Sequence, residues 1–268
     1  MKKKTDVFFD IDGCFIDEKY RFNIPVDELK KELRKYFGEI NFHLNSNRSL
    51  KNIIDIWSQI KTNGLIVYEN GQGVFNPAKN LDENAFGVKF SRENLKKSLK
   101  NLCDRVSFIS TDDLVKSPEK FFSSLSKEAY CEKSRIFTAT VYPRVINQGI
   151  PTENDEFTSN VFERLKKVYG EKYNLFFSKK YGNIILTPKN ALKSNPMKKI
   201  AGENRIASFG DEIPDILMFQ ESSPKMIGCP ANAREEVKRF VRKNNGLVSR
   251  KSYTEGVLDF VNYIQKII

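Results

Sequence analysis

Two aspartates, Asp10 and Asp12, directly follow a short apolar run at residues 7–9. Such a run, rich in β-branched and aromatic residues, is typical of a buried strand in a parallel sheet. Ligands of open α/β sheets bind at the carboxyl ends of the strands, where this pair would lie. Two carboxylates one residue apart repel each other unless a cation or a shared proton neutralises them. The spacing therefore predicts a site for a divalent metal with oxygen ligands, and a surface turn with two acidic residues is the alternative.

A hydroxyl side chain stands at the end of a second predicted strand. Residues 40–45 alternate between apolar and polar side chains, and apolar residues at helical spacing follow over 50–60. Ser46 therefore lies between a strand and a helix, where a hydroxyl and free backbone N–H groups can hold a phosphate. Arg48 adds positive charge nearby. The alternative interpretation is that Ser46 caps the helix.

A second pair of aspartates follows another predicted strand late in the chain. Residues 205–209 have the strand pattern, and Asp211 and Asp215 follow across a turn in which Pro214 suits the first turn of a helix. A helix cap is again the alternative, yet two strand ends that each carry paired aspartates favour one shared site. Lys193 precedes this strand, and by itself it would be interpreted as a solvated surface lysine.

The order of the predicted elements indicates an α/β fold. Strands and helices alternate up to about residue 76, which is typical of a parallel sheet with right-handed crossovers. The rhythm changes after residue 77 and returns after residue 188. We therefore predict a parallel-sheet core formed by residues 1–76 and 188–268, with an inserted α+β domain at 77–187.

Periodicity and start and stop signals predict the individual elements. Before the insertion, they predict a helix from Pro25 to Gly38 and a strand at 64–68 that a turn at 69–71 follows. Within the insertion, they predict helices at 92–103 and 156–169, strands at 135–141, 173–177 and 183–186, and a loop at 147–151. After it, they predict a strand at 226–228 and helices at 231–241 and 257–267.

Composition narrows the function classes. The 268 residues are 40% hydrophobic, which is enough for a sizeable core, and carry a formal charge of +11. This charge suits either nucleic acid or anionic small molecules. The basic residues are spread along the chain without an aromatic-basic motif, which disfavours a nucleic-acid partner. No stretch approaches the roughly 18 apolar residues of a membrane helix, and acidic residues interrupt the start of the chain, so a cytoplasmic protein without a membrane partner is expected.

Cysteine and histidine usage excludes several metal sites. Cys14, Cys103, Cys131 and Cys229 are far apart in the sequence, so free thiols are expected and a zinc site is not. His43 is the single histidine and lies in a predicted strand, which excludes a two-histidine site within this chain and favours a structural role.

The residues described above resemble, in order and spacing, the four motifs of the haloacid-dehalogenase-like phosphatases. The four motifs correspond here to residues 10–13, Ser46, Lys193 and residues 210–215. The insertion is similar in placement to the cap of the Cof-type branch, which includes sucrose-phosphate and mannosyl-3-phosphoglycerate phosphatases. Residues 69–71 and 229–238 also resemble that branch. The resemblance implies a Rossmann-like parallel-sheet core with an inserted α+β cap domain.

Three residues depart from the family pattern. Cys14 stands where the family usually has threonine, Asn47 where it usually has glycine, and Pro214 where Cof-type members often have asparagine. None of these changes removes a carboxylate, the hydroxyl or the lysine. We therefore expect these departures to affect substrate binding more than the chemical steps of the reaction. Lys193 is preferred to Lys198 or Lys199 for the third motif because of its spacing to Asp211.

The resemblance also implies a mechanism, that of a Mg²⁺-dependent phosphomonoester hydrolase. Asp10 would attack phosphorus to give an aspartyl-phosphate. Asp12 would protonate the leaving oxygen and then deprotonate the attacking water. Mg²⁺ would be held by Asp10, Asp211 and the backbone carbonyl of Asp12, with Asp215 ordering the metal site. Ser46 and Lys193 would hold the transferring group, and the substrate-binding residues implied are Ser46, Asn47, Arg48 and Lys193.

The expected substrate is a small phosphorylated metabolite, either a sugar phosphate or a small organic acid. Basic and aromatic residues of the cap are candidates to recognise it, or else form a solvated face: Tyr142, Arg144, Lys179 and Lys180. A phosphomutase of the same superfamily is one alternative. A nucleic-acid-binding module that has kept the fold without turnover is another.

Overall fold

The computed structural model describes residues 3–83, 86–110, 126–147, 149–179 and 182–268. By its contacts the chain divides into two compact units: a core unit, Met1–Phe86 with Ala191–Ile268, and an inserted unit, Gly87–Asn190. The sequence analysis predicted that the insertion begins at residue 77. The short strand β5 (Leu81–Asp82) instead pairs with β4 (Gly73–Asn76), so this segment groups with the core unit.

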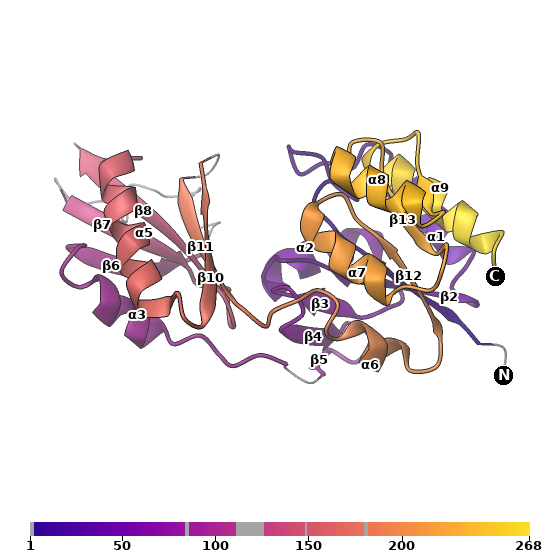
Figure 1. Ribbon diagram of the computed structural model, residues 1–268, viewed down its shortest axis with the longest axis horizontal. Helices are drawn as coiled ribbons and strands as arrows, with labels where there is room; N and C mark the ends of the chain where they lie inside the picture. Colours follow the sequence, from indigo (N-terminus) through magenta and orange to yellow (C-terminus); the bar gives the residue numbers. More distant parts are fainter. Residues whose placement is uncertain (1–2, 84–85, 111–125, 148, 180–181) are drawn as a thin grey trace. The chain divides into compact units, whose positions relative to one another are not determined.

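One sheet organises the core unit. Within the described residues it has eight strands in the order β14-β13-β12-β1-β2-β3-β4-β5 (Figure 1). Neighbouring strands from β14 to β3 pair in parallel, as predicted, whereas β4 and β5 add an antiparallel extension that was not. The remaining bounds are β1 Thr5–Phe9, β2 Ile40–Asn45, β3 Ile66–Tyr68, β12 Arg205–Phe209, β13 Ile227–Cys229 and β14 Leu247–Val248. The predicted α/β fold is confirmed.

Helices cover both faces of the core sheet, which explains why β1 is buried along its whole length. Phe8 packs on one face with Met197 and Met218, whereas the ring of Phe9 lies 6.3 Å from that of Phe260 on the other. The alternation of side chains along a strand produces this division. The helices are α1 Val26–Arg34, α2 Leu50–Ile60, α6 Met197–Ala201, the 3₁₀ turn η2 Ile213–Asp215, α7 Ile216–Glu221, α8 Glu235–Lys243 and α9 Tyr253–Gln265.

The helix ends differ from the predictions by a few residues. Pro25 occupies the N-cap of α1, one residue before the first helical position predicted for it. Ser49 occupies the N-cap of α2, so Ser46 is not the cap of that helix. α8 begins at Glu235 and not at residue 231, because the backbone N–H of Arg234 is bound to the carbonyl of Asp211.

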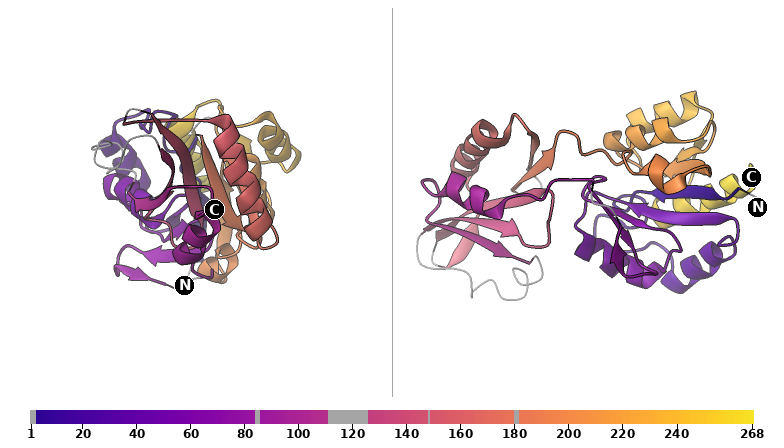
Figure 2. Two further views of the ribbon diagram at one scale, coloured as in Figure 1. Left: turned by 90° about the vertical axis from the view of Figure 1, so that its left-hand side faces the viewer. Right: turned by 90° about the horizontal axis from the view of Figure 1, so that it is seen from below.

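A separate sheet organises the inserted unit. Its strands run in the order β10-β11-β8-β7-β6, and β9 pairs with β8. α3 (Arg92–Leu99) and α5 (Asp155–Tyr169) pack against each other and share an apolar cluster with strands of this sheet (Figure 2). The strands are β6 Arg105–Ile109, β7 Ser126–Glu132, β8 Ala139–Asn147, β9 Ile150–Thr152, β10 Tyr173–Ser178 and β11 Asn183–Pro188.

Several predictions within the insertion were wrong. The strand predicted at 135–141 is β8, which begins only at Ala139, and the loop predicted at 147–151 contains β9. β6 and β7 were not predicted. β7 gives a weak apolar pattern because two of its buried positions are the acids Glu128 and Glu132, which pair with Arg105 and Arg135.

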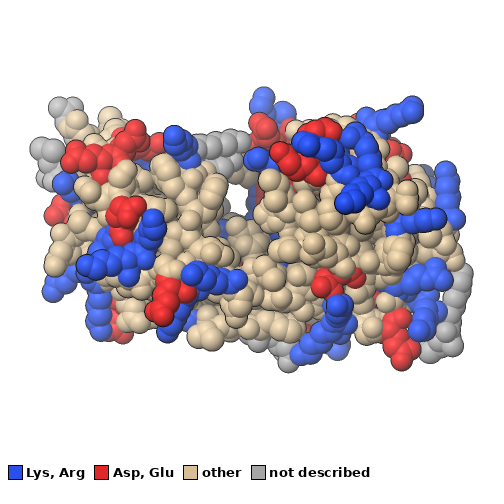
Figure 3. Space-filling model, viewed as in Figure 1, with Lys and Arg blue, Asp and Glu red and all other residues tan. Residues whose placement is uncertain are grey.

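All four cysteines are buried and free. None of the helices in the described residues is long and apolar enough to cross a membrane. On the face drawn in Figure 3, Lys and Arg side chains form separate groups with acidic side chains among them.

His43 has the structural role predicted for it. Its Nδ1 accepts a hydrogen bond from the backbone N–H of Leu65 at 2.9 Å, so the ring proton lies on Nε2. The Nε2–H donates to Oδ1 of Asp6 at 2.7 Å, and both side chains are buried. The ring also stacks on Phe8 at 4.5 Å. His43 thus ties β2 to β1 below the carboxyl edge of the sheet.

Candidate active site

The carboxyl ends of three neighbouring strands bring the predicted site residues together. β1 pairs in parallel with β2 and β12, and Phe9 lies opposite both Leu44 and Phe209. Asp10, Ser46 and Asp211 follow these strand ends within two residues. The backbone N–H of Asp10 continues the ladder by donating to the carbonyl of Phe209 at 2.9 Å. Residues far apart in the sequence therefore share one edge of the sheet.

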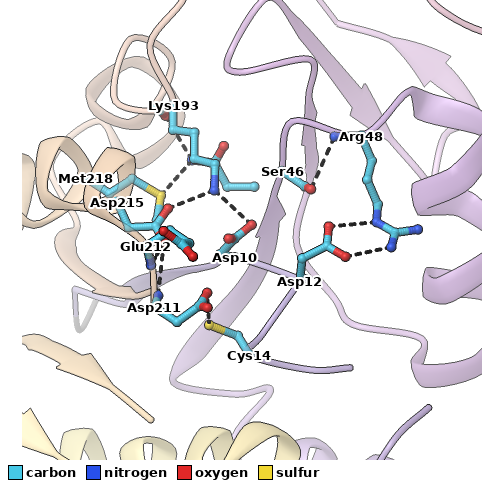
Figure 4. A network of polar contacts seen from close by, with 11 residues as sticks. Asp10, Asp12, Cys14, Ser46, Arg48, Lys193, Asp211, Glu212, Asp215 and Met218 are labelled. Carbon is cyan, nitrogen blue, oxygen red and sulfur yellow. Dashed lines mark hydrogen bonds and ion pairs between the residues drawn. The ribbon is translucent and has the colours of Figure 1, made fainter. Parts of the chain in front are cut away.

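Lys193 lies at the centre of a buried ion-pair network (Figure 4). Its Nζ lies 2.8 Å from Oδ1 of Asp10 and 2.7 Å from Oδ1 of Asp215. Its side chain is 7% exposed, which excludes the alternative of a solvated surface lysine. Burial lowers the pKa of Lys193, but the charges of Asp10 and Asp215 more than offset it, and the net pKa is raised. The ammonium therefore stays charged at neutral pH.

Asp215 organises the turn that follows β12. Its Oδ2 accepts hydrogen bonds from the backbone N–H groups of Asp211 and Glu212, each at 3.0 Å. Because Oδ1 faces Lys193, both oxygens of this fully buried carboxylate have partners. Gly210 makes room for it, since a Cβ there would lie 2.4 Å from Cβ of Asp215. Asp215 thus links the lysine to the backbone that presents Asp211.

Three carboxylates form an acidic cluster beside this lysine. One oxygen each from Asp10, Asp211 and Asp215 lies within 4.8 Å of the others. Burial raises the pKa of Asp10 to about 7, with Lys193 opposing this and the charges of Asp215 and Asp12 adding to it. Burial also raises the pKa of Asp211 to about 8, and the charges of Asp10 and Asp215 contribute. Crowded, buried carboxyl groups of this kind suit a divalent cation that prefers oxygen ligands.

The carboxylate of Asp12 does not join this cluster. Arg48 donates to it through Nε at 2.8 Å and through Nη2 at 2.6 Å, a bidentate contact (Figure 4). The Asp12 side chain is 52% exposed. The backbone N–H of Arg48 also donates to Oγ of Ser46 at 3.2 Å. The sequence indicated positive charge for Arg48 and the family resemblance implied substrate binding, and the structure also pairs it with Asp12.

The turn at 69–71 supports the segment that carries Ser46. The backbone N–H groups of Glu69 and Asn70 donate to the carbonyls of Arg48 and Ser46, at 3.0 and 3.2 Å. Gly71 has a φ of +82°, and a Cβ there would lie 2.2 Å from the carbonyl oxygen of Leu192. The turn thus packs against the residue next to Lys193.

Asn45 and Asn232 are site residues that the sequence analysis missed. The buried amide of Asn45 donates to the carbonyl of Lys193 at 2.8 Å. Asn232 donates to the carbonyl of Gly13 at 2.8 Å and so supports the loop after Asp12. The position of Asn45 at a strand end, beside Ser46, was the available signal. Asn232 lies in the run 229–238 that resembles the Cof-type branch, which was the available signal, but its partner Gly13 is more than two hundred positions earlier in the sequence.

The three departures from the family pattern have different surroundings. The Sγ–H of Cys14 points at Oδ1 of Asp211 at 3.5 Å, so this thiol lies beside the acidic cluster. Burial raises the pKa of Cys14 well above its usual value, and the charge of Asp211 adds to the effect. Pro214 lies in the first turn of η2, as predicted. Asn47 is half-buried directly after Ser46.

The cap residues that are candidates to recognise substrate all belong to the inserted unit. Tyr142 and Arg144 both belong to β8, and the guanidinium of Arg144 lies 5.8 Å from the centre of the Tyr142 ring. Arg144 also donates to the carbonyl of Gly182 at 2.7 Å. Lys179 is exposed just after β10, and Lys180 lies outside the described residues.

Comparison with solved structures identifies the fold. A haloacid dehalogenase-like hydrolase from Bacteroides thetaiotaomicron matches with a TM-score of 0.69 and 17% identity, over 98% of this chain and 100% of that chain. A haloacid dehalogenase-like hydrolase from B. subtilis matches with a TM-score of 0.61 and 15% identity, over 97% and 99%. The sucrose-phosphatase from Synechocystis, in complex with sucrose and phosphate, matches with a TM-score of 0.54 and 14% identity, over 99% of each.

Sequence comparison gives the family. A search of curated proteins found no match. The family model described as haloacid dehalogenase-like hydrolase matches residues 7–261, which includes both strand ends with paired aspartates, Ser46 and Lys193. Since this match spans nearly the whole chain, the protein belongs to the haloacid dehalogenase-like hydrolases.

Proposed function

We propose that this hydrolase is a Mg²⁺-dependent phosphatase that acts through an aspartyl-phosphate intermediate on a small phosphorylated metabolite, with a sugar phosphate as the expected class. The observation that carries the proposal is the buried contact between Lys193 and Asp10 at a strand end, beside two further acids. An aspartate held in this way beside a cation suits nucleophilic attack on an anionic phosphoryl group.

Asp10 is the proposed nucleophile. One of its carboxylate oxygens attacks phosphorus while the bond from phosphorus to the ester oxygen breaks, which leaves the phosphoryl group on Asp10 and releases an alcohol. Water then attacks the same phosphorus, the bond to Asp10 breaks, and inorganic phosphate leaves. Lys193 holds Oδ1 of Asp10 and supplies positive charge where the negative phosphoryl oxygens gather.

Asp12 is the proposed general acid and base. In the first step it donates a proton to the leaving ester oxygen, and in the second it accepts a proton from the attacking water. Its half-exposed side chain, separated from the acidic cluster, is compatible with access to both groups.

The proposed phosphate-binding residues are Ser46, Asn47, Arg48 and Lys193. Ser46 is buried at the end of β2, one strand away from Asp10, and its Oγ already accepts from Arg48. The hydroxyl proton of Ser46 thus remains available for a phosphoryl oxygen. Holding the transferring group in line accounts for most of the rate gain in phosphoryl transfer.

The acidic cluster is the proposed Mg²⁺ site. Asp10 and Asp211 would provide carboxylate ligands, and the family resemblance adds the backbone carbonyl of Asp12. Asp215 would order the site, because both of its oxygens already have protein partners. A bound Mg²⁺ would neutralise the crowded carboxylates and the phosphoryl oxygens. The raised pKa of Asp10 and of Asp211 supports this assignment, since burial and the neighbouring carboxylates outweigh the positive charge of Lys193 at both groups.

Sugar phosphates are the proposed substrate class. The sucrose-phosphatase of similar fold was solved with sucrose and phosphate, which supports testing sugar phosphates first. The inserted unit is proposed to select the leaving group, with Tyr142, Arg144 and Lys179 as candidate residues. A cytoplasmic location also stays a prediction.

Phosphate release from p-nitrophenyl phosphate and a panel of sugar phosphates tests this function, with Mg²⁺ or EDTA. Asp10→Asn should lower turnover on the order of 10³-fold or more. The matched control is Asp27→Asn, because the Asp27 side chain is 96% exposed on α1, away from the site. Near-normal turnover in Asp10→Asn would contradict the nucleophile assignment, and turnover only with a bisphosphate activator would favour a phosphomutase.

A further inference from the structure

Arg48 makes a two-point contact with Asp12 that determines the orientation of this carboxylate. Nε donates to Oδ2 at 2.8 Å and Nη2 donates to Oδ1 at 2.6 Å. A planar guanidinium that binds both oxygens fixes the plane of a carboxylate as well as its position, which a single contact cannot do. Because the Asp12 side chain is 52% exposed, this contact is its main restraint among the residues that the structure describes.

The aromatic ring of Tyr20 also contacts this guanidinium. The guanidinium carbon of Arg48 lies 5.0 Å from the centre of the Tyr20 ring, within the range of a cation–π contact. Tyr20 has a φ of +60°, a backbone conformation that is unfavourable for a residue with a side chain. The turn that imposes it is closed by hydrogen bonds between Asp17 and Arg21, including one from the Arg21 N–H to Oδ1 of Asp17 at 2.9 Å.

The backbone of Arg48 is fixed as firmly as its side chain. Its N–H donates to Oγ of Ser46 at 3.2 Å, and its carbonyl accepts from the N–H of Glu69 at 3.0 Å. One residue therefore joins the proposed phosphate-binding hydroxyl to the proposed acid and base. The separation of Ser46 and Asp12 is consequently built into the protein before a substrate binds.

We infer that Arg48, supported by Tyr20, is a positioning residue that orients Asp12 toward the leaving oxygen. This inference rests on the function proposed above and extends it. Arg48 then acts on the proton-transfer step through Asp12, in addition to any contact with the phosphoryl group. A proton donor must keep its direction as well as its proximity, because misorientation raises the barrier even when the distance is kept.

Leaving-group dependence separates this role from simple charge attraction. p-Nitrophenolate is a stable anion and departs without a proton, whereas the alkoxide of a sugar phosphate must be protonated. The value of kcat/KM reports steps up to departure of the leaving group. Arg48→Met should therefore lower kcat/KM for a sugar phosphate by about 10- to 100-fold more than for p-nitrophenyl phosphate, a share of the typical effect of a general acid. Asp12→Ala should produce the same pattern more strongly.

Conservative variants sharpen the test. Arg48→Lys keeps the charge but not the two-point contact. It should therefore keep KM near the wild-type value and still have a larger loss of kcat/KM for the sugar phosphate than for p-nitrophenyl phosphate. Tyr20→Phe keeps the ring and should behave as wild type. Tyr20→Ser should lower kcat/KM for the sugar phosphate more than for p-nitrophenyl phosphate, as expected for Arg48→Met. Arg242→Met is the control, because it removes an exposed guanidinium that contacts Glu235 on α8.

The outcomes distinguish this inference from the proposed function. If Arg48→Met lowers kcat/KM equally for both substrates, Arg48 binds the phosphate only and the positioning role is wrong. If Arg48→Lys restores both values fully, charge is sufficient and the positioning role is again wrong. If the wild type releases phosphate from no substrate, the proposed function fails and the positioning role is excluded with it.

Discussion

Lys193 and Asp215 form an ion pair of 2.7 Å in which the carboxylate is fully buried. The same ammonium contacts Asp10 at 2.8 Å, so one lysine compensates two buried acids. Because Asp215 also accepts the backbone N–H groups of Asp211 and Glu212, the pair joins the Lys193 segment to the turn after β12. Stability and the geometry of the site therefore depend on the same contact.

Replacing Lys193 should lower both the stability of the fold and the turnover of the enzyme. Lys193→Met leaves Asp10 and Asp215 buried without their cation, and breaking a buried pair in this way costs about 3–5 kcal/mol at neutral pH. Turnover should fall on the order of 10³-fold. Urea unfolding and phosphate release measure the two effects. Lys198→Met is the control, because the Lys198 side chain is 74% exposed, and it should change neither quantity substantially. Wild-type turnover in Lys193→Met would remove this lysine from the mechanism.

Mg²⁺ should stabilise the protein, and Asp211 should be required for this effect. A ligand that binds only the folded state at a hundred times its Kd adds about 2.7 kcal/mol, which raises the Tm. Asp211→Asn should lose most of the Mg²⁺-dependent rise in thermal denaturation. In EDTA, Asp211→Asn should have a higher Tm than the wild type. The folded pKa of Asp211 is raised to about 8, so keeping an ionisable carboxyl group buried there costs free energy at neutral pH, and the Asn side chain removes that cost. Asp27→Asn is the control and should keep the Mg²⁺-dependent rise in Tm. If Asp211→Asn keeps the same rise, the metal does not bind at Asp211.

The sequence predicted the residues at the strand ends correctly because local patterns determine them. Buried runs that end in Asp10, Ser46 and Asp211 have the periodicity of parallel strands, and the parallel order of β2, β1 and β12 brings them to one edge. β7 was missed because buried, ion-paired acids such as Glu128 take the place of apolar residues, so the pattern that predicts a strand is absent.

Long-range contacts were beyond a single sequence. The Arg48 contact with Asp12 and the Asn45 contact with the Lys193 carbonyl join segments that only the folded sheet brings together. From its sequence neighbours alone, each of these residues is interpreted as a charged or polar residue close to a loop. The pairing depends on side-chain direction, which periodicity does not encode.

Gly13 should tolerate no side chain. It has a φ of +75°, and a Cβ there would lie 2.0 Å from Oδ2 of Asp211. Gly13→Ala must therefore displace the Asp211 carboxylate or the loop after Asp12, and a displacement of about 1 Å near a reacting group can cost about 10²-fold in rate. Phosphate release and the Mg²⁺-dependent change in Tm should both fall. Gly38→Ala is the matched control, because nothing lies within 4 Å of a Cβ at that position. Equal activity of the two variants would show that Asp211 has room to move.

The buried contact between Asp6 and His43 should give the core unit an acid-sensitive contribution to stability. Burial raises the pKa of Asp6, but hydrogen bonds from His43 and Asn41 more than offset this, and the net pKa is lowered from 3.8. A lowered folded pKa means that the charged carboxylate stabilises the fold above the unfolded value of 3.8, and that this contribution is lost as pH falls through the folded pKa. Asp6→Asn keeps an acceptor for the Nε2–H but removes the charge, so it should lower the free energy of unfolding by about 1–3 kcal/mol at neutral pH. The difference from wild type in urea unfolding should shrink below pH 3.8 and vanish below the folded pKa, whereas Asp27→Asn should show no such trend. A difference that persists unchanged in acid would mean that packing around β1 and β2, and not the carboxylate charge, accounts for the loss.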